Sequence, residues 1–254
     1  MKRVVVKVGS AVLTQNDSIA LGRMKDLVDF LCELRETNEV ILVSSGAVAA
    51  GYTSLKLDRS ILQNKQALAS IGQPILMNKY SKKFGVHDVL TAQVLVTAAN
   101  LQREDEIQRI KDTVNTLLSN GVIPIINEND ATSTKELVVG DNDQLSAYIT
   151  KYTDSDLLII LSDIDAYYDK DPRKFTDAKI FKTVHSINQN ELEKEATPLG
   201  AFATGGILTK LKAANYLLGH GIDMVLTSGY DLSDIKSLML QNRHAGGTLF
   251  TKEK

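Results

Sequence analysis

Short apolar runs alternate along this chain with longer segments of helical periodicity. The runs are nearly continuous and rich in β-branched residues, which is typical of strands buried on both faces of a sheet. They cover residues 4–8, 40–43, 89–96, 122–126, 157–161, 224–226 and 248–250. Each of these runs is predicted to form a strand.

Apolar residues at helical spacing fill the segments between the runs, at residues 24–34, 62–76, 107–118, 145–149 and 208–218. Pro74 falls inside the second segment and is predicted to kink or split that helix. Gly219 and Gly221 are predicted to end the last one. The alternation of strand and helix predicts an α/β fold, a three-layer αβα sandwich around an open, mostly parallel sheet.

Domain organisation follows from the same pattern. The 254 residues suffice for one large α/β domain or two small ones, and they contain no Pro/Ser-rich linker, low-complexity tract or internal repeat. The least periodic stretch, residues 163–190, is predicted to form a short hairpin and a surface excursion. We therefore expect one continuous body without a clear domain boundary.

Composition excludes several classes of protein. The chain has 29 Lys and Arg against 31 Asp and Glu, a net charge of -2, and 43% hydrophobic residues. This balance excludes intrinsic disorder and gives no overall attraction to nucleic acid or anionic lipid. The single cysteine, Cys32, cannot form a disulfide framework, and no apolar run approaches the roughly 20 residues of a membrane span. We expect a soluble cytoplasmic protein without nucleic-acid or membrane partners.

Ligands of open parallel sheets bind beyond the carboxyl ends of the strands, so the residues that follow each run matter most. Lys7 stands at the end of the first run, before Gly9 and Ser10. Its side chain either reaches solvent at a sheet edge or is a cation held beside backbone amides that face an anion. Ser45 and Gly46 follow the second run, where a helix start could be an anion site or an ordinary Ser-capped turn.

Two polar clusters follow in the middle of the chain, Asn-Glu-Asn-Asp at residues 127–130 and Gly-Asp-Asn-Asp at residues 140–143. Such residues are common in turns and helix caps, but asparagine amides also bind both the ammonium and the carboxylate of an amino acid. Farther on, Ser162 and Asp163 end a strand. The Thr-Gly-Gly turn at residues 204–206 leads into a helix that carries Lys210, like a phosphate cradle, although it lacks the P-loop pattern.

Other chemistries lack their motifs. No Gly-x-Gly-x-x-Gly follows the first strand, no Gly-x-Ser-x-Gly elbow is present, and the four histidines are dispersed. Cys32 lies within an apolar helix and is interpreted as core packing. Two lysines, Gly-rich turns and a set of Asn and Asp side chains remain. This equipment neutralises charge, so phosphoryl transfer fits it best.

These motifs, in this order and spacing, resemble the amino-acid kinase superfamily and, within it, the glutamate 5-kinases. The Lys-x-Gly start and the Thr-Gly-Gly turn are shared widely in the superfamily, whereas the pair of Asn/Asp clusters is typical of the glutamate 5-kinases. The resemblance implies ATP-dependent phosphorylation of the side-chain carboxylate of L-glutamate, with Mg²⁺ bridging the ATP phosphates and no dedicated protein ligands for the metal. It also implies a homo-oligomer, dimer or tetramer, and feedback inhibition by L-proline.

The resemblance assigns residues to two half-sites, glutamate within about residues 1–150 and ATP within about residues 151–254. It implies that Lys7 and Lys210 flank the transferred group and that Asp143 positions both lysines. The implied glutamate contacts are Ser45, Asn127, Asp130 and Asn142. The implied ATP contacts are Lys7, Ser162, Asp163, Thr204, Gly205, Gly206, Ile207, Leu208, Thr209 and Lys210.

Some features depart from the family pattern. Ala11 stands where a second hydroxyl is frequent, Ser162 where Thr is usual, and Ile207 where Met is frequent. Many bacterial members carry a C-terminal PUA domain, which we expect this chain to lack because it stops at Lys254. Two alternatives stay open. One is another superfamily activity, such as acetylglutamate kinase, aspartokinase, carbamate kinase or uridylate kinase, and the other is a silent amino-acid sensor.

Overall fold

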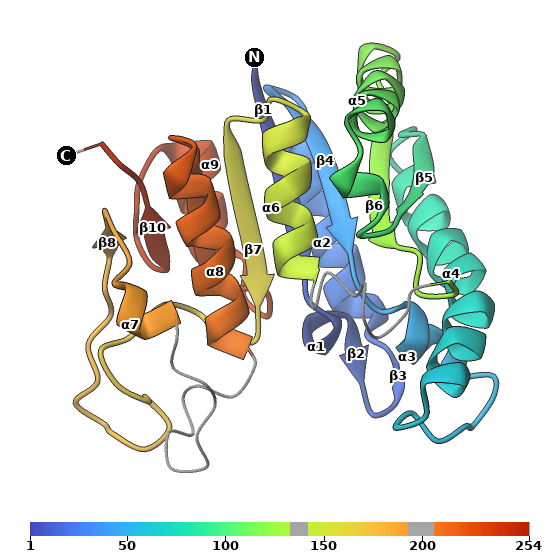
Figure 1. The fold of residues 1–254 in the computed structure, drawn as a ribbon, viewed down its shortest axis with the longest axis horizontal. Coiled ribbons are helices and arrows are strands. Elements are labelled where there is room, and N and C mark those ends of the chain that lie inside the picture. The colour runs from blue at the N-terminus through green and yellow to red at the C-terminus, as the bar shows by residue number, and fades with distance from the viewer. Residues whose placement is uncertain (133–141, 193–205, 254) are drawn as a thin grey trace.

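A computed structural model of the chain describes residues 1–132, 142–192 and 206–253, which build an eight-stranded sheet between two layers of helices (Figure 1). The strand order is β5-β6-β4-β1-β7-β9-β10-β8. The strands are β1 Lys2–Val8, β4 Asn38–Ser44, β5 Thr91–Val96, β6 Ile123–Glu128, β7 Leu157–Ser162, β8 Thr183–Val184, β9 Asp223–Ser228 and β10 Thr248–Phe250. All pairings are parallel except that of β9 with β10, so the predicted open, mostly parallel sheet is confirmed.

Helices connect the strands. They are α1 Ser10–Leu13, α2 Leu21–Leu34, α3 Ala47–Tyr52, α4 Leu62–Gly85, the 3₁₀ turn η1 Asn100–Gln102, α5 Glu104–Ser119, α6 Asn142–Tyr152, α7 Gln189–Leu192, α8 Gly206–Gly219 and α9 Ser233–Gln241. None of the described helices is long and apolar enough to cross a membrane. A short hairpin of β2 Thr14–Gln15 and β3 Ser18–Ile19 lies outside the main sheet.

Apolar side chains form two cores, one on each face of the sheet. One core joins α2, α4 and α9 to the sheet, and the other joins α5, α6 and α8 to the opposite face. Strand β1 shows the alternation that strands require, because Val4, Val6 and Val8 belong to the first core and Val5 belongs to the second. Lys7 is two residues from Val5, so it points to the α6 and α8 face.

One of the two alternatives for Lys7 is excluded, and two expectations need correction. Lys7 does not reach solvent at a sheet edge, because β1 pairs with β4 and β7 and Lys7 is 3% exposed. Pro74 does not split its helix, since α4 runs without interruption to Gly85 and packs along α3. The run at residues 89–96 is not buried on both faces, because β5 is an edge strand with an exposed Leu95.

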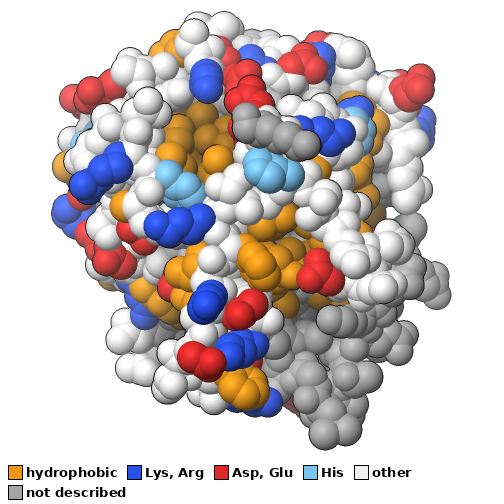
Figure 2. All heavy atoms as spheres, turned by 90° about the vertical axis from the view of Figure 1, so that its left-hand side faces the viewer, with side chains coloured by type: hydrophobic (Ala, Val, Ile, Leu, Met, Phe, Trp, Pro, Cys, Tyr) orange, Lys and Arg blue, Asp and Glu red, His pale blue; other side chains and the backbone are white. Residues whose placement is uncertain are grey.

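The segment between β7 and β10 contains the predicted hairpin. An antiparallel bridge joins Tyr168 to Ile180, and the chain then adds the unpredicted edge strand β8. Three apolar side chains of this excursion, Phe175, Ile180 and Phe181, are substantially exposed. Figure 2 views this end of the sheet and shows apolar patches interrupted by side chains of both charges.

The strands of the β2–β3 hairpin are too short to show an apolar pattern, but the loop between them carries a sequence signal. Asn16 and Asp17 connect the two strands, and both have positive φ angles, 50° and 55°. Two left-handed residues in a two-residue loop favour a tight hairpin, and Asn and Asp tolerate that conformation best after glycine.

Candidate active site

The carboxyl ends of the parallel strands meet at one edge of the sheet. Register pairs Lys7 of β1 with Val43 of β4 and with Ile160 of β7, so the residues that follow these strands lie side by side. The amino-terminal ends of α6 and α8 reach the same edge from the face to which Lys7 points (Figure 1). This arrangement brings together polar residues that lie more than 200 positions apart along the chain.

Two buried lysines share one buried aspartate at this edge. Lys7 Nζ lies 2.5 Å from Asp143 Oδ1, and Lys210 Nζ lies 3.0 Å from Asp143 Oδ2. Asp143 is fully buried, and Lys7 and Lys210 are 3% and 4% exposed. The structure therefore brings together the three residues that were assigned to catalysis.

The electrostatics of this group favour an ionised Asp143. Burial by itself would raise the pKa of Asp143, but the charges and hydrogen bonds of Lys7 and Lys210 outweigh it and hold that pKa below its ordinary value. Thr209 Oγ1 also donates a hydrogen bond to Asp143 Oδ2, at 2.9 Å. Lys210 Nζ donates to the carbonyl oxygen of Gly206, at 2.8 Å, so the first turn of α8 holds its own lysine.

A network of side-chain amides lies next to the lysine pair. Asn142, the residue before Asp143, donates from Nδ2 to Ser45 Oγ at 2.8 Å and to Asn127 Oδ1 at 3.0 Å. Asn127 in turn donates from Nδ2 to Gln73 Oε1 at 3.0 Å. Three of the predicted glutamate contacts thus touch one another, and Gln73 joins them from α4.

Sequence reasoning missed Gln73, although it left a signal. It lies on the buried stripe of α4, four residues after Ala69 and three before Leu76, and is 8% exposed. A glutamine at an apolar position of a helix needs hydrogen-bond partners in the interior, and this requirement distinguishes it from a surface residue.

Helices α3 and α4 approach closely just beside this network. A Cβ atom on Gly51 would lie 1.9 Å from the carbonyl oxygen of Leu68, and one on Gly72 would lie 1.8 Å from that of Ala47. Only glycine fits at both positions. Gly46, which precedes α3, has a φ of 106° that also favours glycine. These glycines fix Ser45 and Gln73 relative to each other.

A cavity of about 350 Å³ opens over the amide network. It is lined by Ser10, residues 45–49, Arg59, Asn127, Glu128, Asp130 and Asn142. Burial, together with the charge of neighbouring Glu128, raises the pKa of Asp130 to about 6. Within the described part of the chain Asp130 forms no ion pair, so this carboxylate faces the cavity without an internal cation.

Arg59 is the second lining residue that the sequence did not reveal. Its guanidinium group lies over the ring of Tyr52, 4.2 Å from the centroid, and 3.4 Å from Asp17 Oδ1. It comes from the segment between α3 and α4, where no motif marks it. It places a cation at the opening of a cavity whose other charged lining residues are acidic.

The predicted nucleotide contacts lie on the other side of the lysine pair. Ser162 Oγ donates to Asp163 Oδ1 at 3.0 Å and accepts from the backbone N–H of Ile164 at 3.2 Å. Gly206, Leu208, Thr209 and Lys210 form the first turn of α8, and Ile207 is buried in the core beneath it. Thr204 and Gly205 lie outside the described residues, so their predicted contacts stay predictions.

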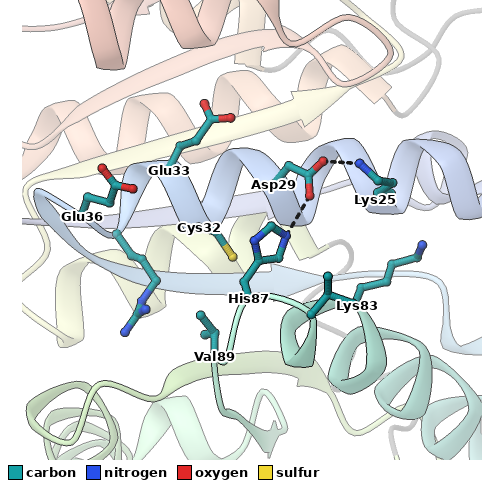
Figure 3. A pocket seen from close by; sticks show the side chains of 10 residues that line it. Lys25, Asp29, Cys32, Glu33, Glu36, Lys83, His87 and Val89 are labelled. Carbon is teal, nitrogen blue, oxygen red and sulfur yellow. Dashed lines mark hydrogen bonds and ion pairs between the residues drawn. The ribbon is translucent and has the colours of Figure 1, made fainter.

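A larger cavity, of about 590 Å³, lies away from this edge, between α2 and the end of α4 (Figure 3). Its charges satisfy one another, because Asp29 accepts from Lys25 at 2.6 Å and pairs with His87 at 2.9 Å. Burial raises the pKa of the Cys32 thiol to about 11, so this cysteine is protonated and a poor nucleophile at neutral pH. The cavity gathers no converging reactive groups.

Among the residues that the structure describes, no group of three His, Cys, Asp or Glu side chains is arranged to hold a metal ion. The donors at the candidate site are ammonium groups, hydroxyls and backbone amides. Such a set fits an anion, and a metal would have to arrive on that anion.

Comparison with known proteins identifies relatives over the whole chain. The profile of the amino acid kinase family matches residues 2–228. The glutamate 5-kinase of Wolinella succinogenes is 49% identical over 257 residues, which cover 99% of this chain and 98% of that protein. The glutamate 5-kinase of Leishmania donovani is also 49% identical, over 98% of this chain and 95% of that protein.

A solved structure supports the fold. Carbamate kinase from Giardia lamblia bound to AMP-PNP superposes with a TM-score of 0.67 at 16% identity and covers 99% of each chain. At this identity the similarity concerns the fold, and it confirms the carbamate kinase-like sandwich that the sequence predicted.

Proposed function

Because this chain belongs to the amino acid kinase family and, within it, to the glutamate 5-kinases, we propose that the carboxyl edge of its sheet carries out the glutamate 5-kinase reaction. The chain transfers the γ-phosphoryl group of ATP to the side-chain carboxylate of L-glutamate and yields L-glutamyl 5-phosphate and ADP. This is the first step of proline biosynthesis. The observation that carries the proposal is the pair of buried lysines on Asp143, next to a cavity lined by amides and carboxylates.

The reaction needs charge compensation more than proton transfer. The acceptor carboxylate has a reference pKa of about 4.3, so it is already ionised at neutral pH and needs no general base. Its approach to ATP brings one anion to another. Lys7 and Lys210 offset that repulsion and stabilise the charge that develops on the transferred group. Asp143 is the positioning residue that holds both ammonium groups.

The amino-acid substrate occupies the cavity of about 350 Å³, with its side-chain carboxylate toward the lysines. Asp130 binds the α-ammonium group, since its carboxylate lines the cavity and forms no ion pair among the described residues. Ser45, Asn127 and Asn142 hold the remainder of the molecule through hydroxyl and amide groups. The carboxylate of Asp130 in the cavity and the lysine pair next to the amide network orient the substrate.

ATP occupies the opposite side of the lysine pair, against Ser162, Asp163 and the start of α8. The backbone amides and hydroxyls there suit phosphate oxygens. Mg²⁺ would be carried on the ATP phosphates and would neutralise part of their charge. The chain thus acts as a single kinase domain with two half-sites, at about residues 1–150 and 151–254.

Three further parts of the proposal rest on the family alone. The chain forms a homo-oligomer, either a dimer or a tetramer. L-Proline acts as a feedback inhibitor at the substrate side. The protein works in the cytoplasm.

One assay tests the reaction. Glutamate, ATP, Mg²⁺ and hydroxylamine are incubated with the protein, and glutamyl hydroxamate is measured with and without proline. We expect hydroxamate to form with glutamate and not with aspartate or acetylglutamate as acceptor, and we expect neither carbamate nor UMP to stimulate release of ADP from ATP. Absence of hydroxamate together with measurable glutamate binding would replace the kinase by an amino-acid sensor.

A further inference from the structure

Gln73 connects the glycine contact of α3 and α4 to the amide network. Its Oε1 atom accepts the hydrogen bond from Asn127 Nδ2 at 3.0 Å, and its side chain is buried. The names of the relatives concern the overall reaction and not this residue. Its importance follows from the direction in which the hydrogen bonds of the network run.

Two backbone groups fix that direction. The backbone N–H of Glu128 donates to Asn127 Oδ1 at 2.9 Å, which leaves Asn127 Nδ2 to face Gln73. At the other end, the carbonyl oxygen of Ser44 lies 3.4 Å from Asn142 Nδ2. A backbone N–H can only donate and a carbonyl oxygen can only accept, so neither asparagine can rotate its amide by 180° without placing like groups together.

This direction decides what the network presents to a substrate. Asn142 Nδ2 has two hydrogens, and its two shortest contacts, to Ser45 Oγ and Asn127 Oδ1, use both. Asn142 Oδ1 accepts no hydrogen bond from the residues that the structure describes, so it can accept one from a substrate. Ser45 Oγ accepts from Asn142, so its own hydrogen is left to donate.

We propose that Gln73 is a positioning residue for the amino-acid substrate, because its carbonyl oxygen anchors the network that leaves Asn142 Oδ1 to accept from the substrate and Ser45 Oγ–H to donate to it. The proposal rests on the glutamate kinase function proposed above. It explains why an amide is present at this position although it is energetically unfavourable: Gln73 Nε2 is buried and has no hydrogen-bond partner in the described structure. An apolar side chain of the same shape would avoid that cost but would supply no acceptor for Asn127.

The test replaces Gln73 by methionine, which has a similar shape and no hydrogen-bonding amide. In Gln73→Met we expect the KM for glutamate to rise about 10-fold or more, with kcat within about 3-fold and the KM for ATP unchanged. Gln93→Met is the matched control, because Gln93 shares an adjoining cavity of about 250 Å³ with Gln73 but lies exposed on β5. It should keep both KM values.

Two measurements separate positioning from a general loss of structure. ATP binding by calorimetry reports whether Gln73→Met keeps its fold, and the double variant with Asn127→Ala reports the route of action. If Gln73 acts through Asn127, then Gln73→Met should change the glutamate KM by less than about 2-fold once Asn127 is absent. Equal effects in both backgrounds would overturn the inference, as would an unchanged KM in the single variant. If the wild-type protein makes no glutamyl hydroxamate, the proposed function fails first.

Discussion

Two carboxylates at the same edge of the sheet, the buried Asp143 and the partly buried Asp130, have opposite surroundings. Asp143 lies between two ammonium groups, which outweigh its burial and lower its pKa. Asp130 lies at the substrate cavity beside Glu128, and burial together with that negative charge raises its pKa to about 6. The two groups face different parts of the candidate site, so the same residue type serves two purposes.

Asp143 preorganises the two lysines, whereas Asp130 is available to recognise a cationic group of the substrate. The charge of Asp143 is compensated inside the protein before any ligand arrives, and the two lysines are thereby held in place without reorganisation during the reaction. Asp130 forms no ion pair with the residues that the structure describes, so a cation that enters the cavity would compensate its charge. We infer that ionised Asp130 lowers the stability of the folded protein and raises its affinity for the substrate, whereas Asp143 keeps the phosphoryl-transfer geometry rigid.

The lysine side of this comparison should show the largest effect. Replacing Lys210 or Lys7 by alanine removes one cation that faces the transferred group, so turnover should fall by about two to three orders of magnitude. Steady-state kinetics with saturating glutamate and ATP would measure it.

Lys212→Ala is a matched control for this experiment, since Lys212 is on the same helix as Lys210 and is exposed. It should retain wild-type turnover. Near-wild-type turnover in Lys7→Ala or Lys210→Ala would contradict the assignment of both lysines and leave Asp143 as a purely structural ion-pair partner.

Sequence patterns were sufficient for most of the fold. Apolar runs located the central strands because a parallel sheet buries both faces, and Lys7 near the end of such a run marked the edge that carries the candidate site. The pattern was insufficient where tertiary contacts contribute. Pro74 does not split α4, which packs on α3 through the close approach at Gly51 and Gly72, a contact that no local pattern encodes.

The candidate site was predictable where residues stand in clusters along the chain. Asn127, Asp130, Asn142 and Asp143 were found because they lie in two short polar motifs, of which the first follows a predicted strand and the second leads into a helix. Gln73 and Arg59 stand alone in the sequence, and only the meeting of α4 and the neighbouring segment with the strand ends brings them to the cavity. Isolated contributors of this kind require the three-dimensional arrangement.

Substitution of Asp130 should change the affinity for glutamate more than turnover. Asp130→Asn removes the partner of the substrate ammonium group, so the KM for glutamate should rise by about 10- to 100-fold with a smaller change in kcat. In the wild type, kcat/KM for glutamate should fall as the pH drops below about 6, because Asp130 becomes protonated in the free enzyme. The same profile should be flat through this range in Asp130→Asn. An unchanged glutamate KM would show that the ammonium group binds elsewhere.

The final prediction concerns stability. Ionisation of the two carboxylates should change the free energy of unfolding in opposite directions. The folded-state pKa of Asp130 is raised from 3.8 to about 6, so its ionisation destabilises the folded state. Its favourable contribution is complete below the unfolded pKa and is lost as the pH rises through about 6. Asp130→Asn should therefore be more stable than the wild type at pH 8, by about 1–3 kcal/mol, and the difference should vanish near pH 4.

Urea unfolding of both proteins without ligands, between pH 4 and pH 8, would measure this difference. For Asp143, whose pKa is lowered, the contribution has the reverse sign: it is present above the unfolded pKa and declines as the pH falls toward the folded value. Asp143→Asn leaves two buried lysines without their counter-ion, so it should lose stability at neutral pH. If both asparagine variants changed stability in the same direction at pH 8, the contrast between a preorganised and a substrate-directed carboxylate would be wrong.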